Sequence, residues 1–178
     1  MNKIHTIRKK AKTVVPRSHW IPEKLFQQIQ KSMPIPTVDL IILRTGHRGT
    51  AETLLIKRKI YPDQGKWCLI GGRILKGEHT QDTIKRQARE ELGVAVKIVP
   101  PWSKIMPFAV FNDPNSDKQK HFVALAYPVV ITRGIMNANG PEFSEARWFS
   151  LNKLPARIGF YHRKVLVSIS KHIKVRKS

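Results

Sequence analysis

Residues 71–94 read GGRILKGEHTQDTIKRQAREELGV, and this stretch decides the fold. It contains four of the twelve acidic residues of the chain: Glu78, Asp82, Glu90 and Glu91. The chain as a whole carries a formal charge of +21, so a local group of carboxylates is not needed for solubility. Carboxylate and carbonyl oxygens are the ligands that magnesium prefers in proteins. The stretch therefore predicts a magnesium site.

The apolar residues of this stretch predict a helix between Thr80 and Gly93. Ile84, Ala88 and Leu92 recur every four residues and form the stripe that we expect to be buried. Thr80 is the expected N-cap, and Gly93 is expected to end the helix in the left-handed conformation. Polar side chains are expected on the opposite face, where adjacent carboxylates would repel each other without a cation: Arg86, Gln87, Glu90 and Glu91.

The spacing of these residues resembles the Nudix box, the signature of the Nudix hydrolases. The matching positions are Gly72, Glu78, Arg86, Ala88, Glu90, Glu91, Gly93 and Val94. The preceding segment GKWCLIGG, residues 65–72, is also similar to the usual lead-in of the family. The resemblance implies an α/β fold, the Nudix α/β/α sandwich with a mixed β-sheet. It also implies a hydrolase that uses Mg²⁺, with Mn²⁺ as an alternative ion.

One position of the box departs from the family pattern, because Gln87 stands where the family has a glutamate. An amide cannot act as a base, so either catalysis is lost or the protein belongs to a branch that does not use that glutamate. The GDP-mannose mannosyl hydrolases are such a branch. Residues 21–43 and 54–67 resemble their N-terminal helix, first strand and Lys-Arg strand. The similarity covers about residues 21–164.

The resemblance also assigns roles to individual residues. Gly71 would offer its carbonyl and Glu91 its carboxylate to the metal, and Arg58 would neutralise the departing diphosphate. Two further carboxylates are expected to hold metal and to take part in catalysis, and three side chains are expected to bind substrate with Arg58. These are Glu90 and Glu142 for the metal and catalysis, and Tyr61, Arg73 and His121 for the substrate.

A second departure concerns the general base. Phe143 stands where the GDP-mannose branch has a histidine, and phenylalanine cannot accept a proton. Either Glu142 or Glu90 activates the water, or the chemistry at the anomeric carbon does not take place. Loss of a general base lowers a rate by about 10²–10⁴-fold, so this position bears directly on activity.

Three functions follow from these observations. The preferred one is hydrolysis of a GDP-sugar such as GDP-mannose, which releases GDP and the sugar. The second is pyrophosphate cleavage of ADP-ribose or of a nucleoside triphosphate. The third is a catalytically weak Nudix fold that binds RNA or a nucleotide through its basic surface, since 33 Lys and Arg face only 12 acidic residues.

The chain reads as one domain with basic ends. Residues 1–20 carry six Lys or Arg and no acid and are expected to form a basic arm. Residues 21–178 are expected to form the domain with its basic C-terminal helix or tail. The basic termini could contact nucleic acid, and the resemblance leaves a homodimer open. No apolar run approaches the roughly 20 residues of a membrane span. The lone Cys68 is expected to be buried and inert, which suits a cytoplasmic protein.

The remaining elements follow from hydrophobic patterning and turn residues. Helices are expected over residues 22–31 and 162–173. Strands are expected over residues 38–43, 53–60, 95–98, 105–111, 121–131 and 145–149.

Overall fold

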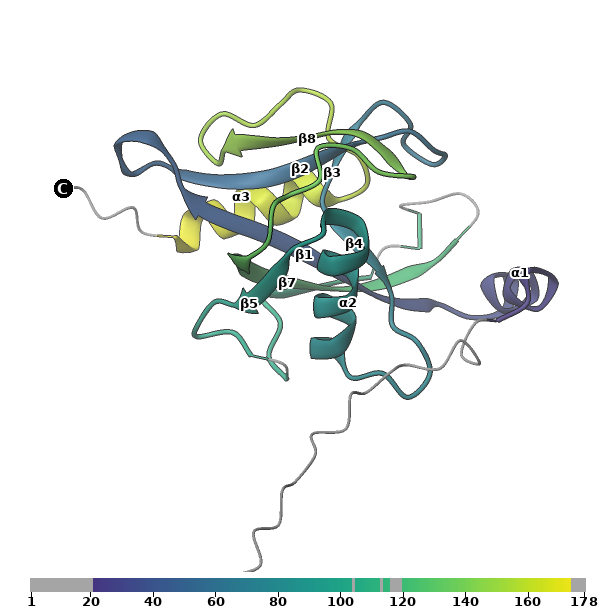
Figure 1. The fold of residues 1–178 in the computed structure, drawn as a ribbon. Coiled ribbons are helices and arrows are strands. Elements are labelled where there is room, and N and C mark those ends of the chain that lie inside the picture. The colour runs from purple at the N-terminus through teal and green to yellow at the C-terminus, as the bar shows by residue number, and fades with distance from the viewer. Residues whose placement is uncertain (1–20, 104, 113, 116–119, 174–178) are drawn as a thin grey trace, which may run out of the picture.

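The computed structural model describes residues 21–103, 105–112, 114–115 and 120–173 of the chain (Figure 1). The predicted basic arm and the last residues of the predicted tail, 174–178, lie outside the described residues. In the described part no helix combines the length and the apolar content that a membrane crossing requires.

Three α-helices and eight strands make up this part of the chain. The helices are α1 (Glu23–Ser32), α2 (Thr80–Leu92) and α3 (His162–His172), and a short 3₁₀ turn, η2, spans His47–Gly49. The strands are β1 (Ile35–Thr45), β2 (Ala51–Arg58), β3 (Trp67–Cys68), β4 (Ile70–Arg73), β5 (Ala95–Ile98), β6 (Ala109–Asn112), β7 (Phe122–Arg133) and β8 (Phe143–Ser150).

All eight strands join one mixed sheet. Its main order is β3-β2-β1-β7-β5, while β4 pairs with β1, β6 with β7 and β8 with β2. The β1–β7 pair is parallel and the other pairs are antiparallel. A parallel pair needs a long connection, and α2 lies within the connection between these two strands (Figure 1).

Two hydrophobic cores lie on the two faces of the sheet, because successive side chains of a strand point to opposite faces. On one face Val38, Leu40 and Ile42 of β1 pack in the core that contains the apolar stripe of α2. On the other face Ile41 and Leu43 pack in the core that contains the apolar residues of α3. The sheet is thus covered by a helix on each side, which confirms the predicted α/β class with a mixed sheet.

The predicted helix of the box is confirmed in its last residue and in its buried stripe. Ile84, Ala88 and Leu92 are at most 1% exposed, and Gly93 has a φ of 74°. Two details were wrong. His79 is the N-cap instead of Thr80, and no side chain caps the helix. Gln87 was expected on the polar face but is only 8% exposed, because it packs under the glycine pair of β4.

Most of the other predicted elements are confirmed with ends that differ by one to three residues. The strand over residues 95–98 matches β5, and α3 ends one residue before the prediction. The strand expected over residues 105–111 was wrong in its first half, because β6 begins at Ala109. Before it, Ser103 and Met106 form an isolated bridge that interrupts the extended chain.

The glycine pair allows β4 to pack closely against β1 and α2. A Cβ on Gly71 would lie 2.3 Å from the carbonyl oxygen of Val38, and one on Gly72 would lie 2.2 Å from the amide group of Gln87. No side chain fits at either position without moving its neighbours. Gly71 pairs directly with Asp39 of β1, so the beginning of the box is fixed against the centre of the sheet.

Cys68 has the environment predicted for it. Its side chain is fully buried, and burial raises the pKa of the thiol to about 12. A thiol with this pKa stays protonated at neutral pH and is a poor nucleophile.

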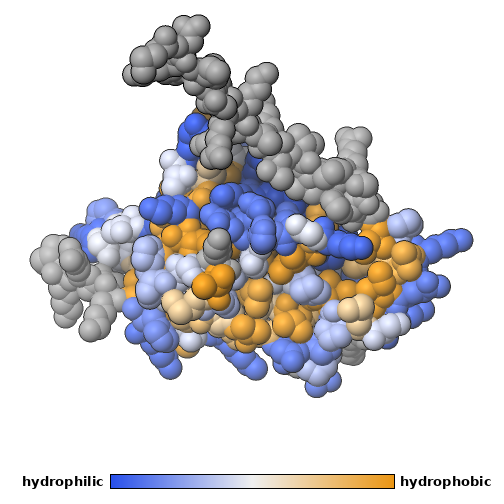
Figure 2. Space-filling view, turned by 90° about the horizontal axis from the view of Figure 1, so that it is seen from below, coloured by the Kyte–Doolittle hydropathy of each residue, from blue (hydrophilic) through white to orange (hydrophobic). Residues whose placement is uncertain are grey.

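The surface mixes hydrophilic and apolar residues. Among the described residues, several large apolar side chains are exposed, including Ile105 and Ile135 at 86% and 92%. Figure 2 shows this mixture on the face seen from below.

Candidate active site

A cavity of about 500 Å³ is lined by residues of α1, β1, β2, β4 and α2 and by the segment that leads into α3. This volume is typical of sites for small ligands. Seven of the eight site residues proposed from the sequence line it: Arg58, Tyr61, Gly71, Arg73, Glu90, Glu91 and Glu142. His121 does not line it. A ring nitrogen of His121, Nε2, lies 2.6 Å from Oδ1 of Asn112.

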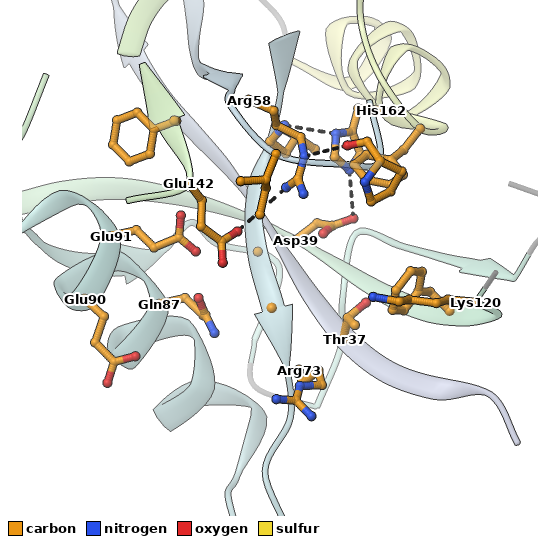
Figure 3. Close-up of a pocket in the computed structure, with 18 of the residues that line it drawn as sticks. Thr37, Asp39, Arg58, Arg73, Gln87, Glu90, Glu91, Lys120, Glu142 and His162 are labelled. Atoms are coloured by element: carbon orange, nitrogen blue, oxygen red, sulfur yellow. Dashed lines mark hydrogen bonds and ion pairs between the residues drawn. The ribbon is translucent and has the colours of Figure 1, made fainter. Parts of the chain in front are cut away.

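Three carboxylates lie on one side of the cavity (Figure 3). Glu90 and Glu91 come from the last turn of α2, and Glu142 comes from the residue before β8. Burial, together with the charges of Glu142 and Glu90, raises the pKa of Glu91 to about 7, although Arg58 opposes the shift. Glu91 is therefore a carboxylate that the protein itself leaves poorly compensated.

The donor chemistry of this wall fits a divalent cation. Carboxylate oxygens of three glutamates are hard donors, and Gly71 lines the same cavity from β4. Within the described residues no three His, Cys, Asp or Glu side chains stand close enough to enclose an ion. Glu90 lies 3.3 Å from Arg86, and Glu142 lies 4.0 Å from Arg58. Both are about half exposed, so both have room to turn toward Glu91 around a cation.

Gln87 connects Arg86 and Glu91. In the amide orientation that satisfies both ends, Gln87 donates a hydrogen bond to Oε1 of Glu91 over 3.0 Å and accepts one from Nη1 of Arg86 over 2.9 Å. The amide orients Glu91 but cannot take a proton from water.

Glu78 and Arg86 form a separate, closed pair. Nε and Nη2 of Arg86 donate to the two oxygens of Glu78 over 2.7 and 2.9 Å, and the side chain of Glu78 is 1% exposed. The backbone N–H of Leu75 and the hydroxyl of Thr83 complete its hydrogen bonds. Burial raises the pKa of Glu78, but these donors outweigh it and lower the pKa below its ordinary value. Arg86 also donates to the carbonyl of Arg73, so the pair ties α2 to the end of β4.

Arg58 has a fixed position at one end of the cavity. Its Nε donates to the carbonyl of Pro62 over 3.0 Å, and its guanidinium lies 5.5 Å from the ring centroid of Phe160. The side chain is 15% exposed. A guanidinium held in this way presents its remaining donors to an anion in the cavity. Tyr61, on the adjacent loop, is 63% exposed at the rim.

A buried polar cluster beside Arg58 was missed from the sequence. Asp39, Tyr161 and His162 all line the cavity, and Asp39 is 7% exposed. The hydroxyl of Tyr161 donates to Oδ2 of Asp39, and Nε2 of His162 lies 3.5 Å from the same oxygen. Because Nδ1 of His162 accepts the N–H of Leu69 over 3.0 Å, the neutral ring carries its proton on Nε2, facing Asp39. One feature of the sequence could have revealed this cluster. Asp39 lies in the apolar strand VDLIIL, and an aspartate in such a strand indicates a buried charge that needs partners.

Phe143 packs in the hydrophobic core as well as lining the cavity. It is 1% exposed and belongs to the core that contains α2. A Cβ on Gly140 would lie 2.6 Å from its ring, so the neighbouring loop is fitted to it. The position of the branch's histidine base is thus occupied by a core side chain.

Comparison with known proteins identifies the family. The model of the NUDIX domain matches residues 33–168. An ADP-ribose pyrophosphatase of Methanocaldococcus jannaschii is 31% identical over 133 residues, which are 75% of this chain and 71% of that protein. The low-salt glycan biosynthesis protein Agl8 of Haloferax volcanii is 32% identical over 111 residues, 62% of this chain and 68% of that protein.

Solved structures agree with the sequence relatives. The crystal structure of a MutT NUDIX hydrolase from Burkholderia pseudomallei has a TM-score of 0.66 at 27% identity, covering 78% of this chain and 99% of that chain. Nudix hydrolases generally use divalent metal ions, and the oxygen donors of the cavity wall suit such an ion. The matched residues include the glycine pair, the box helix and all of the cavity lining except Phe26 and Gln30. The chain therefore belongs to the Nudix hydrolase family.

Proposed function

We propose that this protein hydrolyses a nucleoside diphosphate sugar with the help of a divalent metal ion, Mg²⁺ or Mn²⁺. The observation that carries the proposal is the composition of the single cavity described above. One side offers three carboxylates, one end offers the fixed guanidinium of Arg58, and a hydrogen-bonding cluster lies beside Arg58. Metal, diphosphate and a hydroxyl-rich group each have matching partners in such a cavity.

Different residues of the cavity are proposed to bind the diphosphate, the sugar and the metal and to accept the proton. Arg58 binds the diphosphate and neutralises the charge that develops on it. Asp39, held by Tyr161 and His162, accepts hydrogen bonds from hydroxyl groups of the sugar. Glu91, with Glu90, Glu142 and the carbonyl of Gly71, would hold the metal, which supplies Lewis-acid stabilisation of the developing charge. Glu90 and Glu142 are the exposed carboxylates of the wall and our candidates for accepting a proton from water.

Pyrophosphate cleavage of ADP-ribose is our first candidate reaction. Attack at phosphorus does not need the histidine base of the GDP-mannose branch, and Phe143 excludes a base at that position. The relative from Methanocaldococcus jannaschii is named an ADP-ribose pyrophosphatase.

Release of GDP from a GDP-sugar such as GDP-mannose is the second candidate. Gln87 favours it, because the branch that this chain resembles does not use a glutamate at that position. The relative Agl8 is named a low-salt glycan biosynthesis protein, a name that suits a substrate containing a sugar.

Product analysis separates the two reactions. Purified protein is incubated with ADP-ribose or with GDP-mannose, with Mg²⁺ or Mn²⁺, in water labelled with ¹⁸O. Pyrophosphate cleavage yields AMP and ribose 5-phosphate with the label on a phosphate, whereas attack at the sugar yields GDP and labelled free mannose. Absence of product from both substrates and from related nucleoside diphosphate sugars with either ion would refute the proposal. Contact of nucleic acid with the basic termini and formation of a homodimer stay predictions.

A further inference from the structure

Arg58, the cation that we assign to the diphosphate, is held by groups from two separate segments. Its Nε donates to the carbonyl of Pro62 over 3.0 Å, and its guanidinium carbon lies 5.5 Å from the ring centroid of Phe160. Pro62 belongs to the loop between β2 and β3, whereas Phe160 belongs to the segment before α3. A residue that fixes these two segments against each other therefore also fixes the position of the cation.

The side chain of Asp63 joins the two segments. Its Oδ2 accepts the backbone N–H of Phe160 over 2.5 Å, and its Oδ1 accepts a hydrogen bond from Nζ of Lys66. The carboxylate is 16% exposed. Burial raises the pKa of Asp63, but the hydrogen bonds from Lys66 and Phe160 outweigh it and lower the pKa below its ordinary value. Asp63 is therefore a charged acceptor at neutral pH, which strengthens its hydrogen bond with Phe160.

The backbone at both ends of this hydrogen bond is in the left-handed region. Asp63 has a φ of 62° and Phe160 has a φ of 49°. Aspartate adopts this conformation more readily than most residues, whereas a bulky phenylalanine keeps it only where the surrounding structure enforces it. A Cβ on Gly159 would lie 2.7 Å from Oδ2 of Asp63, so the turn before Phe160 is fitted closely around the carboxylate.

The same residue also orients the carbonyl of Pro62. Asp63 follows Pro62 directly, and the peptide between them is planar, so the φ of Asp63 sets the direction of that carbonyl relative to the carboxylate. The loop is closed by backbone hydrogen bonds, since the N–H of Gly65 donates to Arg58 over 2.9 Å and that of Arg58 donates to Lys66 over 3.0 Å. Asp63 does not line the cavity, so it acts on a ligand through the groups around Arg58.

We propose that Asp63 is a positioning residue that holds Arg58 in the orientation needed to bind the diphosphate. The carboxylate keeps the ring of Phe160 against the guanidinium and the carbonyl of Pro62 at Nε. The donors on Nη1 and Nη2 then meet a diphosphate without first losing the freedom of a long side chain. The inference rests on the proposed function, which assigns the diphosphate to Arg58.

The side-chain NMR signals of the arginines test this role in the free protein, before any ligand is added. A hydrogen bond slows the exchange of an Nε proton with water, and comparison with Arg58→Lys identifies the signal of Arg58 in a sample labelled with ¹⁵N. Asp63→Gly removes the carboxylate but accepts the φ of 62°, so it should speed the exchange at Arg58 by roughly tenfold. Asp63→Asn keeps an acceptor for the N–H of Phe160 and should restore the slow exchange.

The Nε proton of Arg86 is a control in the same spectrum. Arg86 donates this proton to Glu78 over 2.7 Å, in a pair that does not involve Asp63. Its exchange in Asp63→Gly should be as slow as in the wild type, which shows that the fold is intact. Three results would overturn the positioning role: fast exchange at Arg58 already in the wild type, unchanged exchange there in Asp63→Gly, or equal acceleration at Arg58 and Arg86.

Binding of a diphosphate tests whether the position of Arg58 matters to the ligand. α,β-Methylene-ADP, which resists hydrolysis, is titrated with Mg²⁺ by calorimetry into the wild type, Asp63→Gly, Arg58→Lys and the double variant. Asp63→Gly should weaken binding by roughly 3- to 10-fold, because a long side chain must then be ordered on binding. In the Arg58→Lys background it should cause no further loss, since the side chain that Asp63 positions is gone. Additive losses would show that Asp63 does not act through Arg58.

A matched control and the free-protein measurement separate this role from the proposed reaction. Glu145→Gln removes a carboxylate that pairs with Arg147 outside the cavity, and it should bind the ligand as the wild type does. A loss in Glu145→Gln equal to that in Asp63→Gly would contradict a specific role of Asp63. Absence of binding by the wild type would refute the diphosphate site of the proposed function, while the exchange at Arg58 still decides whether Asp63 fixes that side chain.

Discussion

Two carboxylates in the same sequence motif, Glu78 and Glu91, have opposite electrostatic environments. Glu78 is closed in by Arg86, a backbone N–H and a hydroxyl, and these donors lower its pKa. Glu91 lies beside Glu90 and Glu142 at the cavity, and burial raises its pKa to about 7. The two positions are 13 residues apart and read alike in the sequence, since both are glutamates of the box.

This difference separates structural from functional roles. The chain provides every partner that Glu78 needs, so Glu78 fixes the loop before α2 and holds Arg86. Glu91 has an amide partner in Gln87 but too little positive charge near it. Poorly compensated charge in a cavity is typical of a site that a ligand completes. Variants at each position should therefore affect different properties.

The largest effect is expected for Glu91→Gln. Loss of a metal-binding carboxylate should lower turnover by roughly 10³-fold, because the stabilisation of charge by the ion is lost. The same change should raise the free energy of unfolding by about 1–2 kcal/mol without divalent ions, because it removes a buried charge that Glu142 repels. Steady-state kinetics and urea unfolding at pH 8 with a chelator measure the two effects. If Glu91→Gln were as active as wild type and less stable, Glu91 would have a structural role like that of Glu78.

Arg86→Met should lower the free energy of unfolding, whereas Glu91→Gln should raise it. It leaves the Glu78 carboxylate buried with two neutral donors, and breaking a buried ion pair from one side costs about 3–5 kcal/mol. Urea unfolding at neutral pH should show a loss of about 3 kcal/mol. Glu52→Gln is the control, since its ion pair with Arg44 is at the surface and should be worth less than about 1 kcal/mol. Similar losses in both variants would show that the buried Glu78–Arg86 pair stabilises the fold no more than a surface ion pair does.

The smallest effect is an acid sensitivity of Glu78. A carboxyl group whose pKa is lower in the folded state stabilises the fold above its unfolded pKa, about 4.3, and this contribution disappears as the pH falls through the folded pKa. Between pH 5.5 and pH 3 the wild type should lose on the order of 1 kcal/mol more than Glu78→Gln does. Parallel pH profiles of unfolding for the two proteins would contradict this assignment.

Local patterns in the sequence predicted the parts of the fold that local interactions decide. The stripe of α2 and its terminal Gly93 are readable because helix periodicity and left-handed glycine depend on neighbours a few residues away. The box spacing also predicted Glu90 and Glu91 as site residues, and both line the cavity. Arg58 and Glu142 came from family resemblance, which carries information on distant contacts that periodicity lacks.

The parts that were missed depend on pairing between distant segments. Tyr161 meets Asp39 across 122 positions of the chain, and no local pattern marks that contact. The burial of Gln87 was missed for a related reason, since a helix wheel does not reveal that β4 passes over that face. The strand predicted over residues 105–111 was wrong in its first half, because β-propensity alone does not show where a strand pairs with a neighbour.

The amide at Gln87 has a consequence for the number of ions that the site can hold. Where the family pattern has a glutamate, this wall carries three carboxylates beside one neutral group. Each dication brings two positive charges, so after the first ion binds, three carboxylates attract a second ion more weakly than four would. If this wall holds the ion as proposed, the stoichiometry of bound metal should be lower in the wild type than in a Gln87→Glu variant.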